Sequence, residues 1–191
     1  MNGYGKIMLI STIIVIISIV IEFKKPLYPL KKDATSNIKR LFWRWLHWAV
    51  IIFMCFFFLF FDIKKYNDNI AIYYSFMTMT LLHWTIGNFC VVSLLETKHY
   101  DVEIEKITTN NIPHLKAIFK DNAKMISNLF YFFGGFNIIY ITFLTKNMNP
   151  YIKYTLFSLF AISYLKNYIF AKESNYEKGL FFDCLMINPY I

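Results

Sequence analysis

Residues 43–62 read WRWLHWAVIIFMCFFFLFFD, and this stretch decides the fold. It is mostly apolar over its 20 residues, which is the length that an α-helix needs to cross the hydrocarbon core of a bilayer. That core offers no water to backbone N–H and C=O groups, so a helix, which satisfies them internally, is the expected form of such a segment. The stretch therefore predicts a membrane-spanning helix.

Four further segments share this apolar character. They are 4–23, 70–95, 125–145 and 151–171, and the last two are joined by the turn-forming link KNMNP. The connections are too short for a soluble domain. We therefore predict an all-α integral membrane helical bundle with about five transmembrane helices, forming a single membrane domain over residues 1–191.

The composition of the whole chain excludes several classes of protein. It is 57% hydrophobic and 17% charged, whereas soluble domains are about 45–50% apolar and about 25% charged. This excludes a disordered chain, a disulfide scaffold and an ordinary cytosolic enzyme. The many Phe, Tyr, Ile, Lys and Asn residues, with few Gly and Pro, indicate an AT-rich genome.

The net charge of +8 raises the question of a nucleic-acid partner. We exclude one because the basic residues cluster beside apolar segments, where membrane orientation and anionic lipid explain them. The expected partners are therefore the lipid bilayer, anionic lipid at the basic cytoplasmic loops, and a membrane-protein partner or a second copy of the chain.

The orientation in the membrane follows from the Lys and Arg residues of the short loops. The 24–44 loop has seven, the 96–124 loop has five and the C-terminal tail has two, whereas the opposite side has five in all. Because cytoplasmic loops carry the excess, we predict an N-terminus outside and a C-terminus in the cytoplasm.

The largest connector contains a candidate surface helix at 113–124. Pro113 is a favoured first helical residue. One face of the helix would be apolar and the other basic, as expected of a helix lying on the membrane surface: Leu115, Ile118 and Phe119 oppose Lys116, Lys120 and Lys124. An ordinary polar connector is the alternative.

Small and polar residues form stripes at helical spacing, as expected where membrane helices contact one another. The stripes are Ser11, Val15, Ser18 and Glu22; Thr80, His83, Gly87 and Cys90; and Asn128, Tyr131, Gly135 and Thr142. The Phe-rich face of 43–62 is better suited to lipid; it comprises Phe53, Phe56, Phe57 and Phe60.

The densest polar group lies toward the cytoplasmic ends of 43–62 and 70–95. We take it as a candidate intramembrane site, formed by His47, His83, Asn88, Cys90, Ser93 and Glu96. At 1.5 Å per residue, His47 lies ~6 Å inside the apolar boundary, at a depth similar to that of Cys90. His83 lies deeper, at ~18 Å.

Three kinds of site use residues of these types: a haem site, a di-iron site and a thiol–imidazole nucleophile pair. The difference in depth argues against a haem shared by His47 and His83. Glu96-x-x-His99 has a spacing used in di-iron bundles, but partner Glu helices are missing. A nucleophile pair of Cys90 with a histidine is compatible with the geometry, yet the sequence has no P-loop, G-x-S-x-G, H-E-x-x-H or C-x-x-C signature. We therefore assign no catalytic residue, cofactor or metal ligand.

The segment Cys90-Val-Val-Ser-Leu-Leu-Glu96 resembles the C-P-L-T-x-L-E signature of an uncharacterised family of small bacterial multi-pass membrane proteins. Cys90, Ser93 in place of Thr, Leu95 and Glu96 fit the signature, and Val91 replaces its Pro. The segment covers less than a tenth of the chain. The family has no established activity, so the resemblance implies a multi-pass membrane protein and no particular reaction.

Glu96 sits at the end of the predicted helix 70–95, where a carboxylate opposes the helix dipole and needs a cationic partner. We predict a contact with Arg44 or Arg40. Three functions remain open: a structural or interaction component, which we favour; passage of a small molecule or ion through the polar group; and, less favoured, a membrane enzyme. They differ in whether His83 faces a cavity or a packed neighbour.

Overall fold

The chain forms a bundle of helices in the computed structural model, which describes all residues except 25, 27, 88–89, 102–112 and 166–191. The elements are α1 (Gly3–Lys24), α2 (Ala34–Phe60), α3 (Asp68–Gly87), α4 (Val91–Thr97), α5 (Pro113–Phe119), the 3₁₀ turn η2 (Lys120–Asn122), α6 (Ala123–Leu144) and α7 (Pro150–Leu165). The described residues contain no strand, so the predicted all-helical bundle is confirmed.

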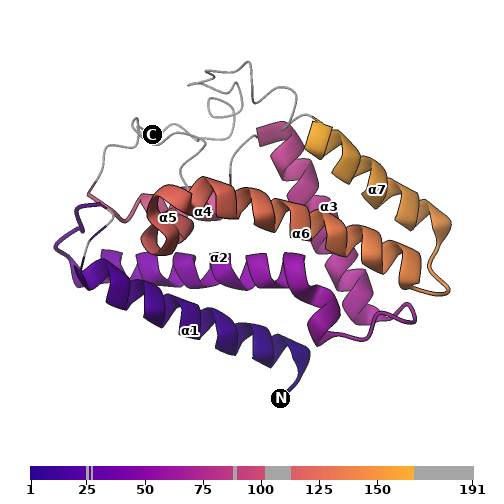
Figure 1. Ribbon diagram of the computed structural model, residues 1–191, viewed down its shortest axis with the longest axis horizontal. Helices are drawn as coiled ribbons and strands as arrows, with labels where there is room; N and C mark the ends of the chain where they lie inside the picture. Colours follow the sequence, from indigo (N-terminus) through magenta and orange to yellow (C-terminus); the bar gives the residue numbers. More distant parts are fainter. Residues whose placement is uncertain (25, 27, 88–89, 102–112, 166–191) are drawn as a thin grey trace.

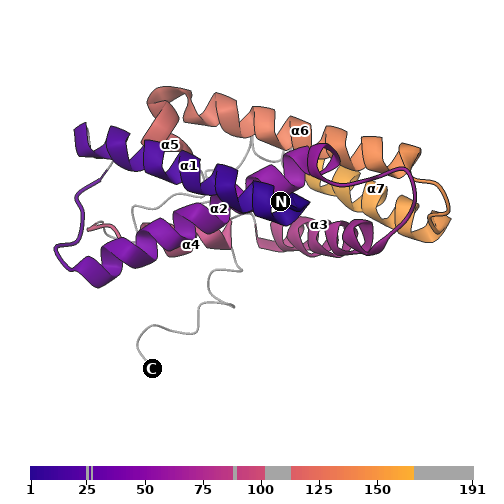
Figure 2. The same ribbon diagram turned by 90° about the horizontal axis from the view of Figure 1, so that it is seen from below.

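Helix α2 is the centre of the bundle. Helices α1, α4 and α6 all pack against it, and α1 and α6 run along opposite sides of it in Figure 1. Helices α3 and α7 pack against each other at the end of the bundle where α2 ends (Figures 1 and 2). Helix α1 runs along the whole of α2, from Glu22 beside Arg40 to Tyr4 beside Phe53 and Phe61. The N-terminal half of α2 also contacts α4, and its C-terminal half also contacts α3.

Three helical stretches are long and apolar enough to cross a membrane by length and composition: Gly3–Lys24, Ala34–Phe60 and Pro113–Leu144. Within the described residues α3 and α7 do not meet that standard. Helix α3 includes polar residues such as Tyr73, Thr80 and His83, and only 16 residues of α7 are described. The count of about five spans therefore stays a prediction for these two segments.

Helix α2 begins nine residues before the predicted start at 43, because Asp33 caps it. The Asp33 carboxylate accepts a hydrogen bond from the Ser36 N–H at 2.7 Å, which satisfies one of the unpaired donors of the first turn. The added turns include Arg40, which is buried. The cap thus brings a charged residue into the bundle that the predicted span omitted.

The prediction of one continuous span over 70–95 is wrong. Helix α3 ends at Gly87, and Cys90 has an extended backbone (φ −98°, ψ 114°) before the short helix α4 begins. Helix α4 then packs against α2 and α5, whereas α3 packs mainly against α7. Because of this break, Ser93 and Glu96 leave the axis of α3 and meet the N-terminal half of α2.

The polar stripe predicted on the first helix is confirmed. The buried residues of α1 are Ile7, Ser11, Val15, Ser18 and Glu22, and the opposite face is exposed. The stripe predicted on α6 holds only in part, since Gly135 and Thr142 are buried but Asn128 is exposed.

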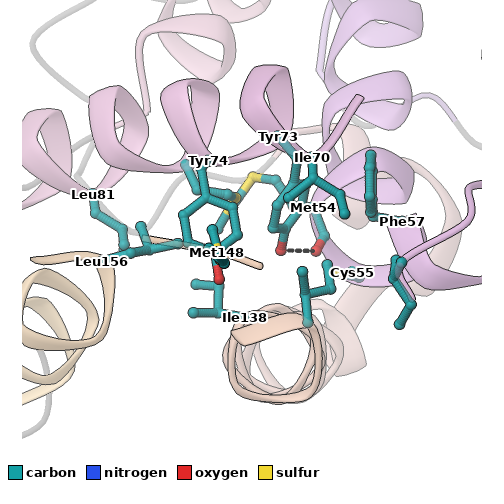
Figure 3. Packing of buried hydrophobic residues seen from close by; sticks show 13 residues of the cluster. Met54, Cys55, Phe57, Ile70, Tyr73, Tyr74, Leu81, Ile138, Met148 and Leu156 are labelled. Carbon is teal, nitrogen blue, oxygen red and sulfur yellow. Dashed lines mark hydrogen bonds between the residues drawn. The ribbon is translucent and has the colours of Figure 1, made fainter. Parts of the chain in front are cut away.

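A hydrophobic core lies between the C-terminal half of α2 and the helices α3, α6 and α7 (Figure 3). Phe57 is fully buried there, so its assignment to a lipid-facing surface was wrong. Helix α2 kinks at Phe56, and the carbonyl of Met54 accepts hydrogen bonds from Tyr73 at 3.2 Å and from Asn137 at 2.6 Å. Two side chains thus compensate for the distorted turn.

Candidate functional site

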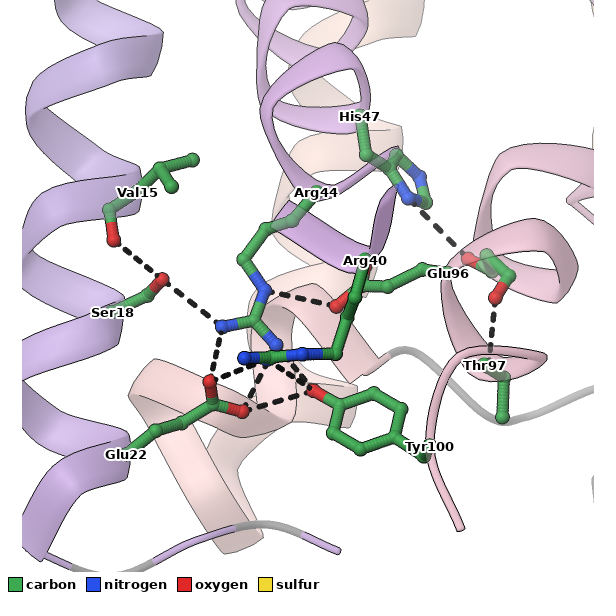
Figure 4. A network of polar contacts seen from close by, with 10 residues as sticks. Val15, Ser18, Glu22, Arg40, Arg44, His47, Glu96, Thr97 and Tyr100 are labelled. Atoms are coloured by element: carbon green, nitrogen blue, oxygen red, sulfur yellow. Dashed lines mark hydrogen bonds and ion pairs between the residues drawn. The ribbon is translucent and has the colours of Figure 1, made fainter. Parts of the chain in front are cut away.

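Two arginines of α2 enclose the last buried residue of α1. Arg40 and Arg44 lie four residues apart, so they share one face of α2. The Nη1 atoms of both lie 2.7 Å from Oε2 of Glu22, and Nη2 of Arg44 lies 3.0 Å from Oε1 (Figure 4). Nη1 of Arg44 also donates to Ser18 Oγ at 3.1 Å. The arginines of α2 therefore bind to two residues of the polar stripe of α1, Glu22 and Ser18.

The same guanidinium links α2 to α4. Nε of Arg44 lies 2.9 Å from Oε1 of Glu96, and both side chains are fully buried. The predicted contact of Glu96 with Arg44 or Arg40 is thereby confirmed. Two carboxylates and two guanidinium groups cancel in charge, which is how a buried ionic cluster avoids an uncompensated charge. We call Glu22, Arg40, Arg44, Glu96 and Tyr100 the ionic cluster.

Tyr100 completes the ionic cluster from the turn that follows α4. Its hydroxyl donates to Glu22 Oε1 at 2.9 Å and accepts from Arg44 and, at 3.3 Å, from Arg40. The guanidinium of Arg40 also lies 5.0 Å from the centre of the Tyr100 ring. Burial raises the pKa of the phenol above its ordinary value, so the hydroxyl keeps the proton that it donates. No pattern in the sequence indicated this role of Tyr100.

His47 lies one turn further along α2 and faces α4. Its Nε2 is 3.4 Å from Cys90 Sγ and its Nδ1 is 3.4 Å from Ser93 Oγ. Thr97 holds α4 locally by donating to the Ser93 carbonyl at 2.7 Å. The predicted similar depth of His47 and Cys90 is thus matched by direct contact.

His114, near the start of α5, is a member of the group that the sequence analysis missed. Its ring lies on the ring of His47, with centroids 3.5 Å apart and planes at 35°. It is buried beneath Trp48, whose ring meets it edge-on at 5.9 Å. In sequence it lies in a connector predicted to rest on the membrane surface, and a histidine next to a helix-starting proline was its only signal.

Beside these side chains lies a cavity of about 490 Å³. Its walls come from α2, α3, α4, α5, α6 and α7 and are mostly apolar, with Met54, Met77, Phe130 and Ile138 among them. Its polar lining includes His47, His83, Cys90, Ser93 and His114. The cavity combines a large apolar surface with a few polar groups, as small-molecule sites do.

The predicted site residues fall into three sets. His47, Cys90, Ser93 and Glu96 lie together, as described above. His83 is half-buried and lines the cavity from α3. Asn88 lies outside the described residues.

The arrangement offers donors for a metal ion, although the sequence analysis assigned no metal ligand. The ligand atoms of His47, Glu96 and His114 all lie within 4.8 Å of one another, and all three residues are buried. Of the two histidines considered as partners for the Cys90 thiol, His47 is the one in contact with it. The polar side chains of His47, Cys90 and His114 therefore form one part of the lining of a cavity whose other walls are mostly apolar.

The chain matches no protein-family model, no curated protein and no solved structure.

Proposed function

We propose that the protein is a multi-pass membrane protein that binds a small amphiphilic molecule in the cavity between α2, α3, α4, α5, α6 and α7. The observation that supports this proposal is the combination of an apolar wall with a polar lining that includes His47, Cys90, Ser93 and His114. A volume of about 490 Å³ falls in the range of small-molecule sites, about 300–1,000 Å³.

The chemistry of the lining defines the class of ligand. Thioether, aliphatic and aromatic side chains favour a hydrocarbon or isoprenoid-like portion. The nearby charges of Arg44 and Glu96 are occupied by each other and by the rest of the ionic cluster. The ligand therefore needs an uncharged polar group that hydrogen-bonds to imidazole, hydroxyl or thiol, rather than a strongly ionised headgroup.

The proposal includes an orientation with the N-terminus outside and the C-terminus in the cytoplasm, which the Lys and Arg distribution supports. In this orientation the ionic cluster and α4 lie toward the cytoplasmic side, and anionic lipid would contact the basic loops. The resemblance of Cys90–Glu96 to the C-P-L-T-x-L-E signature supports a shared membrane role, since this segment supplies Cys90, Ser93 and Glu96.

The test uses the full chain purified in a mild detergent, followed by native mass spectrometry and analysis of the extracted small molecules. We expect a co-purifying apolar species near one per chain. Gly134→Leu should remove it, because Gly134 lines the cavity and its added Cβ meets only Cys55 Sγ at 3.9 Å. Val20→Leu, on the exposed face of α1, is the matched control and should retain the species.

If the wild type carries no bound molecule and a spin-labelled fatty alcohol does not bind to it, the proposal is wrong. The protein would then be better explained as a structural component that packs against membrane partners through exposed helix faces.

A further inference from the structure

Three ligand-type side chains converge from three separate helices. His47 comes from α2, Glu96 from α4 and His114 from α5. Their ligand atoms lie within 4.8 Å of one another, and their exposed fractions are 6%, 0% and 2%. Elements far apart in the sequence have thus been folded around one point.

Two atoms at this point have no hydrogen-bond partner. Glu96 Oε2 and His114 Nδ1 are fully buried and unpaired, whereas Oε1 of the same carboxylate is held by Arg44. Buried polar atoms are nearly always paired, since leaving one unpaired costs about 1–3 kcal/mol. Two of the three residues whose ligand atoms meet here thus carry an unpaired buried atom, which favours a bound cation.

The donor set selects the kind of cation. Two imidazoles and one carboxylate suit Zn²⁺ or Fe²⁺, whereas Mg²⁺ and Ca²⁺ prefer sites built of oxygen. The ionic cluster is neutral by itself, so it does not repel a dication as an unbalanced Arg44 would. Metal–ligand bonds of about 2.0–2.2 Å require ligand atoms that now lie within 4.8 Å of one another to move closer together, and the rings of His47 and His114 to turn apart by rotation about their χ angles.

We propose that His47, Glu96 and His114 bind a divalent first-row transition-metal ion, with a further coordination position directed to the cavity. Three protein ligands and one open position are the pattern of metal sites that act on a ligand rather than only hold a fold. His47 and His114 both line the cavity, so a polar group of a bound molecule would reach the ion there.

Neighbouring side chains hydrogen-bond to two of the three ligands, as the residues around metal ligands commonly do in order to orient them. Arg44 fixes the Glu96 carboxylate through Oε1 and leaves Oε2 available. Cys90 and Ser93 each face one ring nitrogen of His47, so one of them remains to orient the ring when the other nitrogen binds the ion.

The experiment is metal analysis of the full chain, purified in mild detergent without a histidine tag and without chelator. We expect about one Zn or Fe per chain. After removal of the metal, Co²⁺ should restore one equivalent and give visible absorption bands, with X-ray absorption showing nitrogen and oxygen neighbours.

Variants assign the ligands. His114→Ala and the double variant His47→Ala with His114→Ala should lower bound metal to trace amounts, and Glu96→Gln should lower it while keeping the shape of the side chain. His99→Ala, a histidine outside the group, is the control and should retain one equivalent. Retention of metal by the double variant, or a wild type that neither contains metal nor gives a Co²⁺ spectrum, would overturn the proposal.

This site is independent of the ligand proposed above, because its donors need no amphiphile to complete them. Metal and extracted small molecules are measured on the same sample. Metal in a protein that neither carries a co-purifying molecule nor binds the spin-labelled fatty alcohol leaves the metal site standing and rejects the amphiphile. A co-purifying molecule in a protein that neither contains metal nor gives a Co²⁺ spectrum does the opposite.

Discussion

The two halves of α2 are held in different ways. Its N-terminal half is fixed by the ionic cluster. One side chain of this cluster, Arg44, contacts Glu22 of α1, Glu96 of α4 and Tyr100. Its C-terminal half is fixed by Phe57, Tyr73 and their neighbours, which fill space with apolar surface. Apolar packing tolerates exchanges of similar volume. A neutral buried ionic cluster does not, because each loss leaves a charge without a partner.

The largest effect is expected from breaking this charge balance. Arg44→Met leaves Glu22 with Arg40 alone and Glu96 with no cation, and should destabilise the protein by about 3–5 kcal/mol. Adding Glu96→Gln restores neutrality, so the double variant should be more stable than Arg44→Met. Tryptophan fluorescence during thermal unfolding in one detergent measures both. Equal stability of the single and double variants would show that charge balance is not what holds this half together.

Tyr100→Phe tests the hydrogen bonds of the ionic cluster without changing its charge. It removes a donor to Glu22 and an acceptor for Arg44, at a cost of about 1–3 kcal/mol. Because the pKa of Tyr100 is raised in the folded protein, its contribution is complete below pH 10.0 and is lost as the pH rises further. Unfolding measured from neutral to alkaline pH should therefore show a smaller alkaline loss in Tyr100→Phe than in the wild type.

Adjacent glycines on α6 test shape in the region of apolar packing. A Cβ at Gly135 would lie 2.1 Å from Phe160 Cζ, whereas a Cβ at Gly134 meets only Cys55 Sγ at 3.9 Å. Both alanine variants gain the same helix propensity, so their difference isolates the contact between α6 and α7. Gly135→Ala should be less stable than Gly134→Ala by about 1–2 kcal/mol. Adding Phe160→Leu should reduce the difference, and its persistence would contradict this assignment.

The smallest effect is expected at the cap of α2. Hydrogen bonding from Ser36 lowers the pKa of Asp33, so the contribution of this carboxylate is present above its ordinary pKa of 3.8 and is lost as the pH falls through the lower folded value. Asp33→Ala should lower the melting temperature slightly. Asp33→Asn should keep the cap and lose this acid dependence, and the same loss of stability in acid for Asp33→Asn as for the wild type would refute the role of the charge.

The features that could be predicted from sequence are those that one helix determines alone. The stripe from Ser11 to Glu22 is readable because residues three and four apart share a face. The exception is the contact of Glu96 with Arg44 or Arg40, which joins two helices and was predicted because a carboxylate at a helix C-terminus opposes the helix dipole and needs a cation. Tyr100 and His114 were missed because neither lies in a segment that was predicted to span the membrane, and their roles depend on how the connectors fold back onto α2.

Hydropathy and spacing alone predicted an all-helical chain with stretches apolar enough to cross a membrane, and they located the packing face of α1, because both depend on neighbours within a few residues. The tertiary structure decided the break at Cys90, which turns α4 away from α3 and toward α2. It also brought His47, Glu96 and His114 to one point beside a cavity. That convergence depends on the relative rotation of three helices, which no local pattern specifies.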